Sequence, residues 1–182
     1  MHKRTDKNEQ FFREVINGVN GETIRVLCVY FARPESRWED SYDEDQYMFR
    51  RLADNLDREI ETLLASYDMD DFTENIAASD VIFINGGMKG HLKDMLFSLD
   101  LDRFRQMLDG KTLVGISARA NILSKYYYSM VVDGIREGTG LLNIKLLTHY
   151  SEDEPEKLNL LQSFGEDLPV VTVSEEEYVI IQ

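Results

Sequence analysis

The stretch LVGISARAN, Leu113–Asn121, carries a strand-like apolar run through Gly115 to a serine and then into an alanine-rich segment that is typical of a first helical turn. A serine at such a turn has two interpretations. It is a nucleophile on a strained elbow, where small neighbours relieve crowding and the helix N-terminus stabilises negative charge. Alternatively, Ser117 is a helix N-cap in a tight connection, which is the commoner case. The rest of the chain has to decide between them.

Apolar strands alternate with helical segments along the chain. The pattern predicts strands at 23–32, 80–85, 112–116, 144–150, 169–174 and 177–182. It predicts helices at 8–17, 43–67 and 118–127, and further helices near 91–108 and 154–164, with a short helix or turn at 71–79. This alternation indicates an α/β fold with a mostly parallel sheet. We expect a single domain over residues 1–182, in which 1–22 form a polar helical segment.

Composition narrows the class of protein. The 182 residues carry a formal net charge of −14, which argues against a nucleic-acid partner. No apolar run approaches the roughly 20 residues of a spanning helix, and the N-terminus lacks the apolar core of a signal peptide, so we expect no membrane association and a cytoplasmic location. The lone cysteine, Cys28, excludes an internal disulfide and a cysteine-based zinc site. The acidic stretches lack a metal-loop spacing, so we expect neither a metal nor a cofactor.

Two further features fall at predicted strand ends. In VIFINGG, a buried strand ends at Gly86 and Gly87, whose backbone N–H groups are suited to binding an anion, although a plain flexible turn fits equally well. His149 closes another strand about thirty residues after Ser117, and it is the best candidate for a general base among three histidines. Ligands of open α/β sheets collect beyond the carboxyl ends of the strands, so these features are expected to share one crevice.

Four segments together resemble one family. They resemble motifs of the dipeptidase E and cyanophycinase family of serine peptidases, and they occur in the same order as in that family. The segments are VLCVYFARPESRWEDSY, SDVIFINGGMKGHL, GISARAN and DGIREGTGLLNIKLLTHY. The resemblance runs from about Ile24 to the C-terminus. It implies the flavodoxin-like, three-layer α/β/α fold that this family shares with class I glutamine amidotransferases.

The resemblance also implies roles for residues. Ser117 matches the family's nucleophile, His149 matches its base, and Asp133 lies one position from its third, acidic member. The backbone amides of Gly87 and Ala118 match the oxyanion donors. A serine hydroxyl needs a neutral imidazole to remove its proton, and an acid orients that imidazole, so the set is chemically coherent.

The chain departs from the family pattern at several positions. Arg119 replaces the second glycine of the elbow, Met88 replaces an asparagine, and Asn85 replaces the first of three glycines. The family usually opens with another strand, whereas this chain begins with a polar helix. The absent strand makes a homodimer through an exposed sheet edge one expectation.

Three classes of function follow. The first is a serine hydrolase that cleaves small Asp-containing peptides, with a cationic side chain, that of Arg119, Arg33 or Arg37, binding the substrate carboxylate. The second is a catalytically degenerate relative that binds a ligand or a protein. A glutamine amidotransferase is disfavoured because its elbow carries a cysteine, and this one carries Ser117. An intact elbow predicts a strained backbone at Ser117 and an Arg119 side chain that points to the crevice or to solvent.

Overall fold

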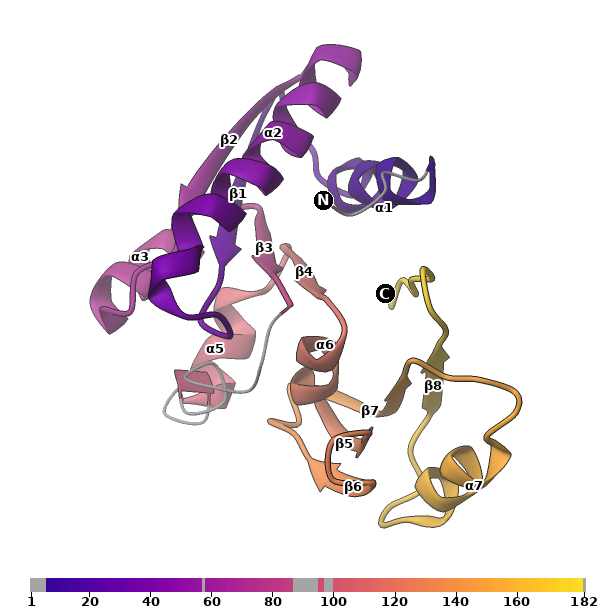
Figure 1. Cartoon of the computed structure of the whole chain (residues 1–182). Helices are drawn as coiled ribbons and strands as arrows, with labels where there is room; N and C mark the ends of the chain where they lie inside the picture. Colours follow the sequence, from indigo (N-terminus) through magenta and orange to yellow (C-terminus); the bar gives the residue numbers. More distant parts are fainter. Residues whose placement is uncertain (1–5, 57, 87–94, 97–99, 182) are drawn as a thin grey trace.

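The computed structural model describes residues 6–56, 58–86, 95–96 and 100–181. Its strands form two four-stranded sheets, with the orders β2-β1-β3-β4 and β6-β5-β7-β8. In Figure 1 the N-terminal sheet and its helices lie on one side, and the second sheet with α7 lies on the other. The α/β class and the mostly parallel sheet predicted from the sequence are confirmed.

The first sheet contains β1 (Thr23–Val29), β2 (Glu59–Leu64), β3 (Val81–Ile84) and β4 (Thr112–Gly115). All three pairings are parallel, and the register joins Val26 to Val81 and Ile84 to Gly115. Residues 26–29 of β1 are completely buried, as expected for a central strand covered on both faces. β1, β3 and β4 are adjacent and parallel, in agreement with the mostly parallel sheet that the sequence predicts.

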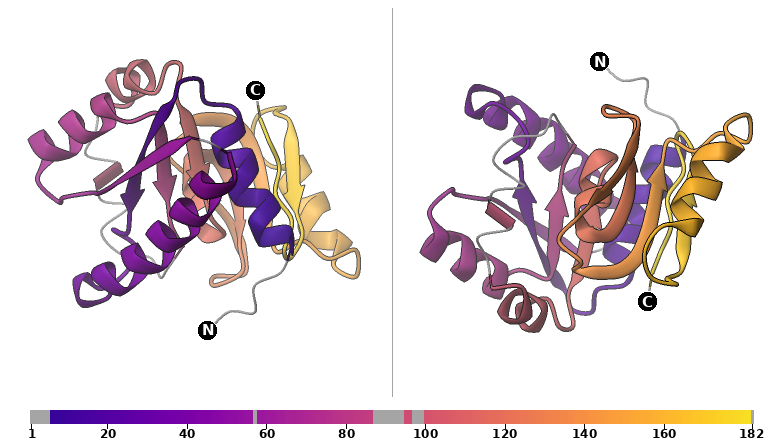
Figure 2. Two further views of the ribbon diagram at one scale, coloured as in Figure 1. Left: turned by 90° about the horizontal axis from the view of Figure 1, so that it is seen from above. Right: turned by 90° about the horizontal axis from the view of Figure 1, so that it is seen from below.

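Helices cover both faces of the first sheet. Figure 2 shows α1 (Asp6–Asn17) and α2 (Trp38–Leu56) on one face, and α3 (Met69–Ala78) and α5 (Leu101–Met107) on the other. A short 3-10 turn, η1 (Glu35–Arg37), leads into α2. Asp68 and Asp100 begin α3 and α5, because each carboxylate accepts two backbone N–H groups of the first turn. None of the described helices has the length and apolarity that crossing a membrane requires.

The helix predicted over 43–67 is wrong in its second half. Ile60, Leu63 and Leu64 continue the helical spacing, yet Glu59–Leu64 form β2 and pair in parallel with Thr23–Cys28 of β1. Hydrogen bonds to β1 stabilise an extended conformation of these residues. In a short segment such tertiary contacts outweigh the helical spacing of the apolar side chains. Of the helix expected over 91–108, residues 91–94 and 97–99 lie outside the described residues, and 101–107 are helical.

The second sheet contains β5 (Ser124–Ser129), β6 (Gly134–Glu137), β7 (Leu142–Thr148) and β8 (Val170–Val173). Only the β5–β6 pair is antiparallel. The helix predicted over 118–127 is therefore too long, because α6 spans Ala118–Leu123 and the tyrosines that follow are in β5. Tyr127 packs against Ile144 and Leu146 on one face of the sheet. Tyr128 packs on the other face, where α7 (Pro155–Ser163) covers it.

The C-terminal segment differs from its prediction as well. Residues 177–181, expected to be an edge strand, have no regular secondary structure, and Gln182 lies outside the described residues. The Tyr178 ring instead packs against Phe11 of α1, with 5.7 Å between the ring centroids. The aromatic contact draws the segment toward α1, and Val179, Ile180 and Ile181 stay about half exposed.

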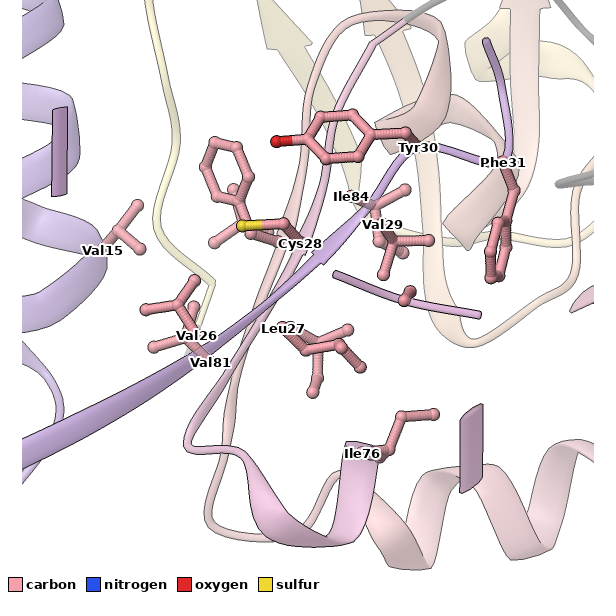
Figure 3. Close-up of a cluster of buried hydrophobic side chains, with 14 of the residues drawn as sticks. Val15, Val26, Leu27, Cys28, Val29, Tyr30, Phe31, Ile76, Val81 and Ile84 are labelled. Carbon is pink, nitrogen blue, oxygen red and sulfur yellow. The ribbon is translucent and has the colours of Figure 1, made fainter. Parts of the chain in front are cut away.

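The core contains the single cysteine. Figure 3 shows the Cys28 sulfur among buried side chains that include Val26 and Tyr30, and Cys28 has no solvent exposure. Burial, followed by the negative charge of Asp45, raises the pKa of the Cys28 thiol to about 12. The thiolate is the reactive form, so this cysteine is inert in the folded protein.

Iodoacetamide at pH 8 is therefore expected to leave native Cys28 unmodified. With a pKa of about 12, the thiolate fraction at this pH is about 10⁻⁴, against about a quarter for an ordinary cysteine. Mass spectrometry should find alkylation at least ~10³-fold slower than for glutathione, and rapid alkylation in guanidinium chloride. Rapid modification of the native protein would contradict the burial of the thiol.

Candidate active site

Ser117 sits on a strained turn between β4 and α6. Its backbone has φ 56° and ψ −131°, a conformation that non-glycine residues rarely adopt. The turn also requires Gly115, because a Cβ there would lie 2.9 Å from the Cα of Ala120. The expected strained elbow is thus present, with its serine exposed at the carboxyl end of β4.

His149 follows β7 and meets the serine. The Ser117 Oγ and His149 Nε2 atoms are 2.8 Å apart, within the distance expected for a nucleophile and its base. His149 also has a positive φ, 60°. A buried hydrogen bond of 3.0 Å from Asn121 Nδ2 in α6 to Thr148 Oγ1 ties the two turns together. Strained backbone at both residues is typical of a functional site.

Glu175 is the acidic partner of the histidine. Its Oε1 lies 2.5 Å from His149 Nδ1, the ring nitrogen that faces away from the serine. Glu175 comes just after β8, and a backbone hydrogen bond of 3.1 Å from Tyr150 N to Val173 O holds the two strand ends together. In this geometry the acid fixes the ring so that Nε2 faces Ser117. The contact is open to solvent, since the Glu175 side chain is 76% exposed.

Asp133, the acid expected from the sequence, is elsewhere. It lies in the turn between β5 and β6, where its Oδ1 accepts a 2.6 Å hydrogen bond from the Tyr128 hydroxyl. The structure thus brings Glu175 to His149 and leaves Asp133 with Tyr128. Asp133 lies at the tip of the hairpin that β5 and β6 form, because Tyr126–Ser129 pair antiparallel with Gly134–Glu137.

The expected oxyanion donors are described in part. Gly87 and Met88 lie outside the described residues. Ala118 begins α6 directly after Ser117, and its backbone amide is one of the first N–H groups of that helix. Gly86, the residue before Gly87, packs beside the elbow. A Cβ atom on Gly86 would lie 3.7 Å from the carbonyl oxygen of Ile116, the residue before Ser117.

Arg119 is completely buried. Among the described residues, its Nε, Nη1 and Nη2 atoms have no hydrogen-bond partner. The sequence-based expectation that the side chain points to the crevice or to solvent is therefore wrong, because Arg119 has no exposure to solvent and does not line the cleft. Burial, followed by the positive charge of Arg33, lowers the pKa of Arg119 to about 10. An unpaired buried cation destabilises a fold, and such groups are commonly retained for function.

A polar cluster lies at the ends of β1 and β3. Arg33 Nε donates to the Gly86 carbonyl at 2.8 Å, Nη1 to Ser41 Oγ at 2.6 Å and Nη2 to Asn85 Oδ1 at 3.2 Å. Asp45 accepts hydrogen bonds from the Asn85 amide and from the Tyr30 hydroxyl. The sequence indicates Arg33 only as one candidate cation for the substrate carboxylate. The sequence signal for the cluster is that Arg33 and Asn85 follow two neighbouring strands, β1 and β3.

A cleft of about 1740 Å³ connects these groups. Its wall includes Ser117, His149 and Glu175, and also Arg33 and Asn85. The edge strand β4 of the first sheet and strands β7 and β8 of the second sheet line it as well. Arg119 is not part of this wall. No group of three or more His, Cys, Asp or Glu among the described residues is arranged to hold a metal ion.

Comparison with known proteins identifies the family. The sequence profile of peptidase family S51, which contains dipeptidase E and cyanophycinase, matches residues 2–182. The chain belongs to peptidase family S51. Membership makes it a serine-type peptidase by family. A search of curated proteins found no significant match.

A solved structure shows the same fold. The crystal structure of a peptidase from an acI-B1 Actinobacterium has a TM-score of 0.60 to this chain and 23% sequence identity. The match covers 93% of this chain and 75% of that chain. At this identity the likeness supports the three-layer α/β/α architecture, and the chemistry of the site has to be argued from its own residues.

Within family S51, two departures of this chain are each linked to Arg33. Asn85 accepts a hydrogen bond from Arg33, and the charge of Arg33 acts on Arg119. The sequence carries both changes 34 positions apart, and only the fold relates them. The sequence signal for Glu175 is the acidic run directly after β8, because the carboxyl ends of parallel strands lie at the same edge of a sheet.

Replacement of Arg119 by Met is expected to stabilise the protein. Met fills a similar volume and removes the desolvated, unpaired charge, so the free energy of unfolding should rise by about 1–3 kcal/mol. The midpoint of thermal unfolding should rise by roughly 2–12 °C for a chain of this size. The matched control is Arg37→Met, whose side chain is 68% exposed and should change stability by less than about 0.5 kcal/mol. A lower midpoint for Arg119→Met would mean that the guanidinium stabilises the fold.

Proposed function

We propose that this S51 peptidase works through a triad of Ser117, His149 and Glu175. The observation that carries the proposal is the chain of two contacts, 2.8 Å from serine to histidine and 2.5 Å from histidine to glutamate. All three residues follow the carboxyl ends of strands, β4, β7 and β8, and line one cleft. The acid comes after the histidine in this chain, in place of the Asp133 position that the resemblance indicated.

The chemistry follows from this arrangement. His149 Nε2 takes the proton of Ser117 as Oγ attacks the scissile carbonyl, and Glu175 stabilises the imidazolium that forms. The backbone amide of Ala118 and, from the family pattern, that of Gly87 donate to the oxyanion. Collapse of the intermediate transfers the proton to the leaving amine and leaves an acyl ester on Ser117. Water, deprotonated by His149, then hydrolyses the ester and restores the serine.

The narrower proposal is that the substrates are small peptides containing aspartate. It rests on the family resemblance and on charge, because the Arg33 side chain lines the same cleft as Ser117. A carboxylate in this part of the cleft would meet positive charge. The cleft itself exceeds the 300–1,000 Å³ of usual small-ligand pockets, so its volume does not limit the peptide to two residues.

One observation favours a second function, a noncatalytic peptidase-like protein. Arg119 stands where the family has a glycine, two positions after the serine, and its guanidinium has no hydrogen-bond partner in the part of the chain that the structure describes. The intact serine-to-histidine contact argues for the hydrolase, and labelling of the serine distinguishes the two.

A fluorophosphonate probe is expected to label the native protein and not Ser117→Ala. The probe phosphonylates a serine only when a base activates it, so labelling reports the working pair. The measurement is intact-protein mass spectrometry, with Ser129→Ala as a control that should label as the native protein does. An unlabelled native protein together with a labelled Arg119→Gly variant would support the noncatalytic alternative. If neither the native protein nor any variant is labelled, the proposal of serine catalysis is refuted.

Glu175→Gln is expected to lower kcat by about 10²-fold or more, because a neutral amide does not stabilise the imidazolium and allows the wrong tautomer. Asp133→Asn is the matched control and should change kcat by less than about twofold, since its partner is Tyr128. The assay follows release of the C-terminal residue from Asp-Leu, with Asn-Leu and Leu-Leu as comparison peptides. A large effect of Asp133→Asn with none of Glu175→Gln would reverse the assignment, and equal rates on the three peptides would remove the proposed preference for aspartate.

A further inference from the structure

The acid of the candidate triad has little to hold its own side chain in place. The Glu175 side chain is 76% exposed, and its hydrogen bond within the described residues is the one to His149 Nδ1. An exposed ion pair gains little free energy, because water screens the charges and the long side chain loses rotamer freedom. The contact therefore needs a backbone that already presents the carboxylate to the imidazole.

Glu175 lies in a tight turn at the end of β8. The Glu177 N–H donates to the Ser174 carbonyl at 3.3 Å. Glu175 and Glu176 are thus the two central residues of a four-residue turn. Glu176 has a φ of 59°, in the left-handed region that glycine or asparagine usually occupies at this place in a turn. A glutamate keeps such a conformation only where the surrounding contacts determine it.

The strand side of this turn is held by β7. Val173 is the last residue of β8 and pairs with Thr148 of β7. Its carbonyl accepts a 3.1 Å hydrogen bond from the backbone N–H of Tyr150, the residue after His149. The backbone that carries the base and the backbone that leads to the acid are therefore fixed relative to one another as far as Val173. The other side of the turn needs a separate contact.

Tyr178 supplies a contact on that side. Residues 177 and 179–181 are exposed, and Tyr178 between them is partly buried. Its ring packs against Phe11 of α1, with 5.7 Å between the ring centroids and 57° between the ring planes, which is within the range of favourable aromatic pairs. In both views of Figure 2 the C-terminal segment runs beside α1.

Phe11 is itself anchored in the core of the first sheet. Its ring centroid lies 6.4 Å from that of Phe83 in β3 and 5.5 Å from that of Phe12. Phe12 stacks on Phe83 at 5.6 Å, and Phe83 is completely buried. The contact of Tyr178 with Phe11 therefore joins the turn that carries the acid to a closely packed part of the other sheet.

We propose that Tyr178 is a positioning residue for the triad: by packing on Phe11 it holds the turn that presents the Glu175 carboxylate to His149 Nδ1. The proposal rests on the proposed function, because it assigns Tyr178 to the acid of that triad. The effect of Tyr178 on the reaction passes through Glu175. The acid stabilises an imidazolium that forms only during the reaction, so loss of its position slows the chemical step and leaves ground-state affinity unchanged.

The test is inactivation by an uncharged fluorophosphonate, which separates the rate constant kinact from the affinity constant KI. Tyr178→Ala is expected to lower kinact by about tenfold with KI within about twofold of the native value, since a freed turn that presents the carboxylate about a tenth of the time gives this factor. Tyr178→Phe keeps the ring and should retain the native kinact. An unchanged kinact in Tyr178→Ala, or a raised KI with normal kinact, would overturn the proposal.

The matched control is Phe164→Ala. It removes another partly exposed ring, which packs against Tyr126 with 5.3 Å between the centroids, at the end of α7. This variant loses an aromatic contact of the same kind, and its kinact should stay within about twofold of the native value.

A double variant tests whether the effect passes through the acid. In the Glu175→Gln background, Tyr178→Ala should lower kinact by less than about twofold further, because the carboxylate that Tyr178 positions is no longer there. A purely structural role of Tyr178 would lower kinact by the same factor in both backgrounds. That additive result would refute the proposal.

A variant on the other side of the contact guards against misfolding. Phe11→Leu keeps an apolar side chain in the core and removes the ring that packs on Tyr178, so it should lower kinact by about three- to tenfold. If Tyr178→Ala fails to fold, as judged by its thermal unfolding, an unchanged kinact in Phe11→Leu overturns the proposal.

The ¹⁵Nδ1 resonance of His149 separates failure of this proposal from failure of the proposed function, because it reports the carboxylate contact without catalysis. It should shift in Tyr178→Ala in the same direction as in Glu175→Gln, and stay in place in Tyr178→Phe. An unlabelled native protein would refute the serine hydrolase, and a shifted resonance in Tyr178→Ala would still support the positioning of the acid. Normal native labelling with an unshifted resonance in Tyr178→Ala would refute the positioning role alone.

Discussion

The site depends on the close approach of α6 to β4. A Cβ at Gly115 would lie 2.9 Å from the backbone of Ala120, so the helix can start immediately after the strand only because position 115 lacks a side chain. This contact forces Ser117 into its positive-φ conformation and exposes the hydroxyl at the strand end. Hydrogen bonds from Ala120 N to Ser117 O and from Asn121 to Thr148 then fix the serine turn relative to β7. The 2.8 Å contact with His149 follows from these constraints.

The surroundings of the elbow combine exposed and buried charges. The His149–Glu175 pair is open to water, where Coulomb attraction is weak, so its value lies in orientation of the ring more than in stability. Arg119 is the opposite case, because its buried guanidinium has no partner among the described residues and its charge is destabilising. The polar cluster around Arg33 lies between these extremes, because each described arm of the guanidinium has an acceptor. The candidate site therefore contains at least one residue, Arg119, that lowers the stability of the fold close to Ser117 in the sequence.

Local pattern predicted much of the fold. β1, β3 and β4 are short apolar runs bounded by polar residues, and α1, α3 and α7 begin and end within a few residues of their expected limits. The errors occur where helical spacing and strand character coincide. Residues 59–64 and 124–129 each follow a helix without a strong break, and each is extended because a neighbouring strand supplies hydrogen bonds. The last predicted strand, at 177–182, had no such neighbour and is irregular where it is described.

The sequence by itself determined the class of fold, the strand-to-helix turn at Ser117 and the candidate base, His149, because these follow from runs of adjacent residues and from motif order. The tertiary structure decided the acid, since Asp133 and Glu175 both follow apolar segments and only the parallel pairing of β7 with β8 brings Glu175 to the imidazole. It also decided the state of Arg119, which is buried and unpaired within the described ranges, and joined Arg33 to the turn at Asn85 and Gly86. Contacts between residues tens of positions apart depend on how strands pair and helices pack, and that information is not carried by any single stretch of the chain.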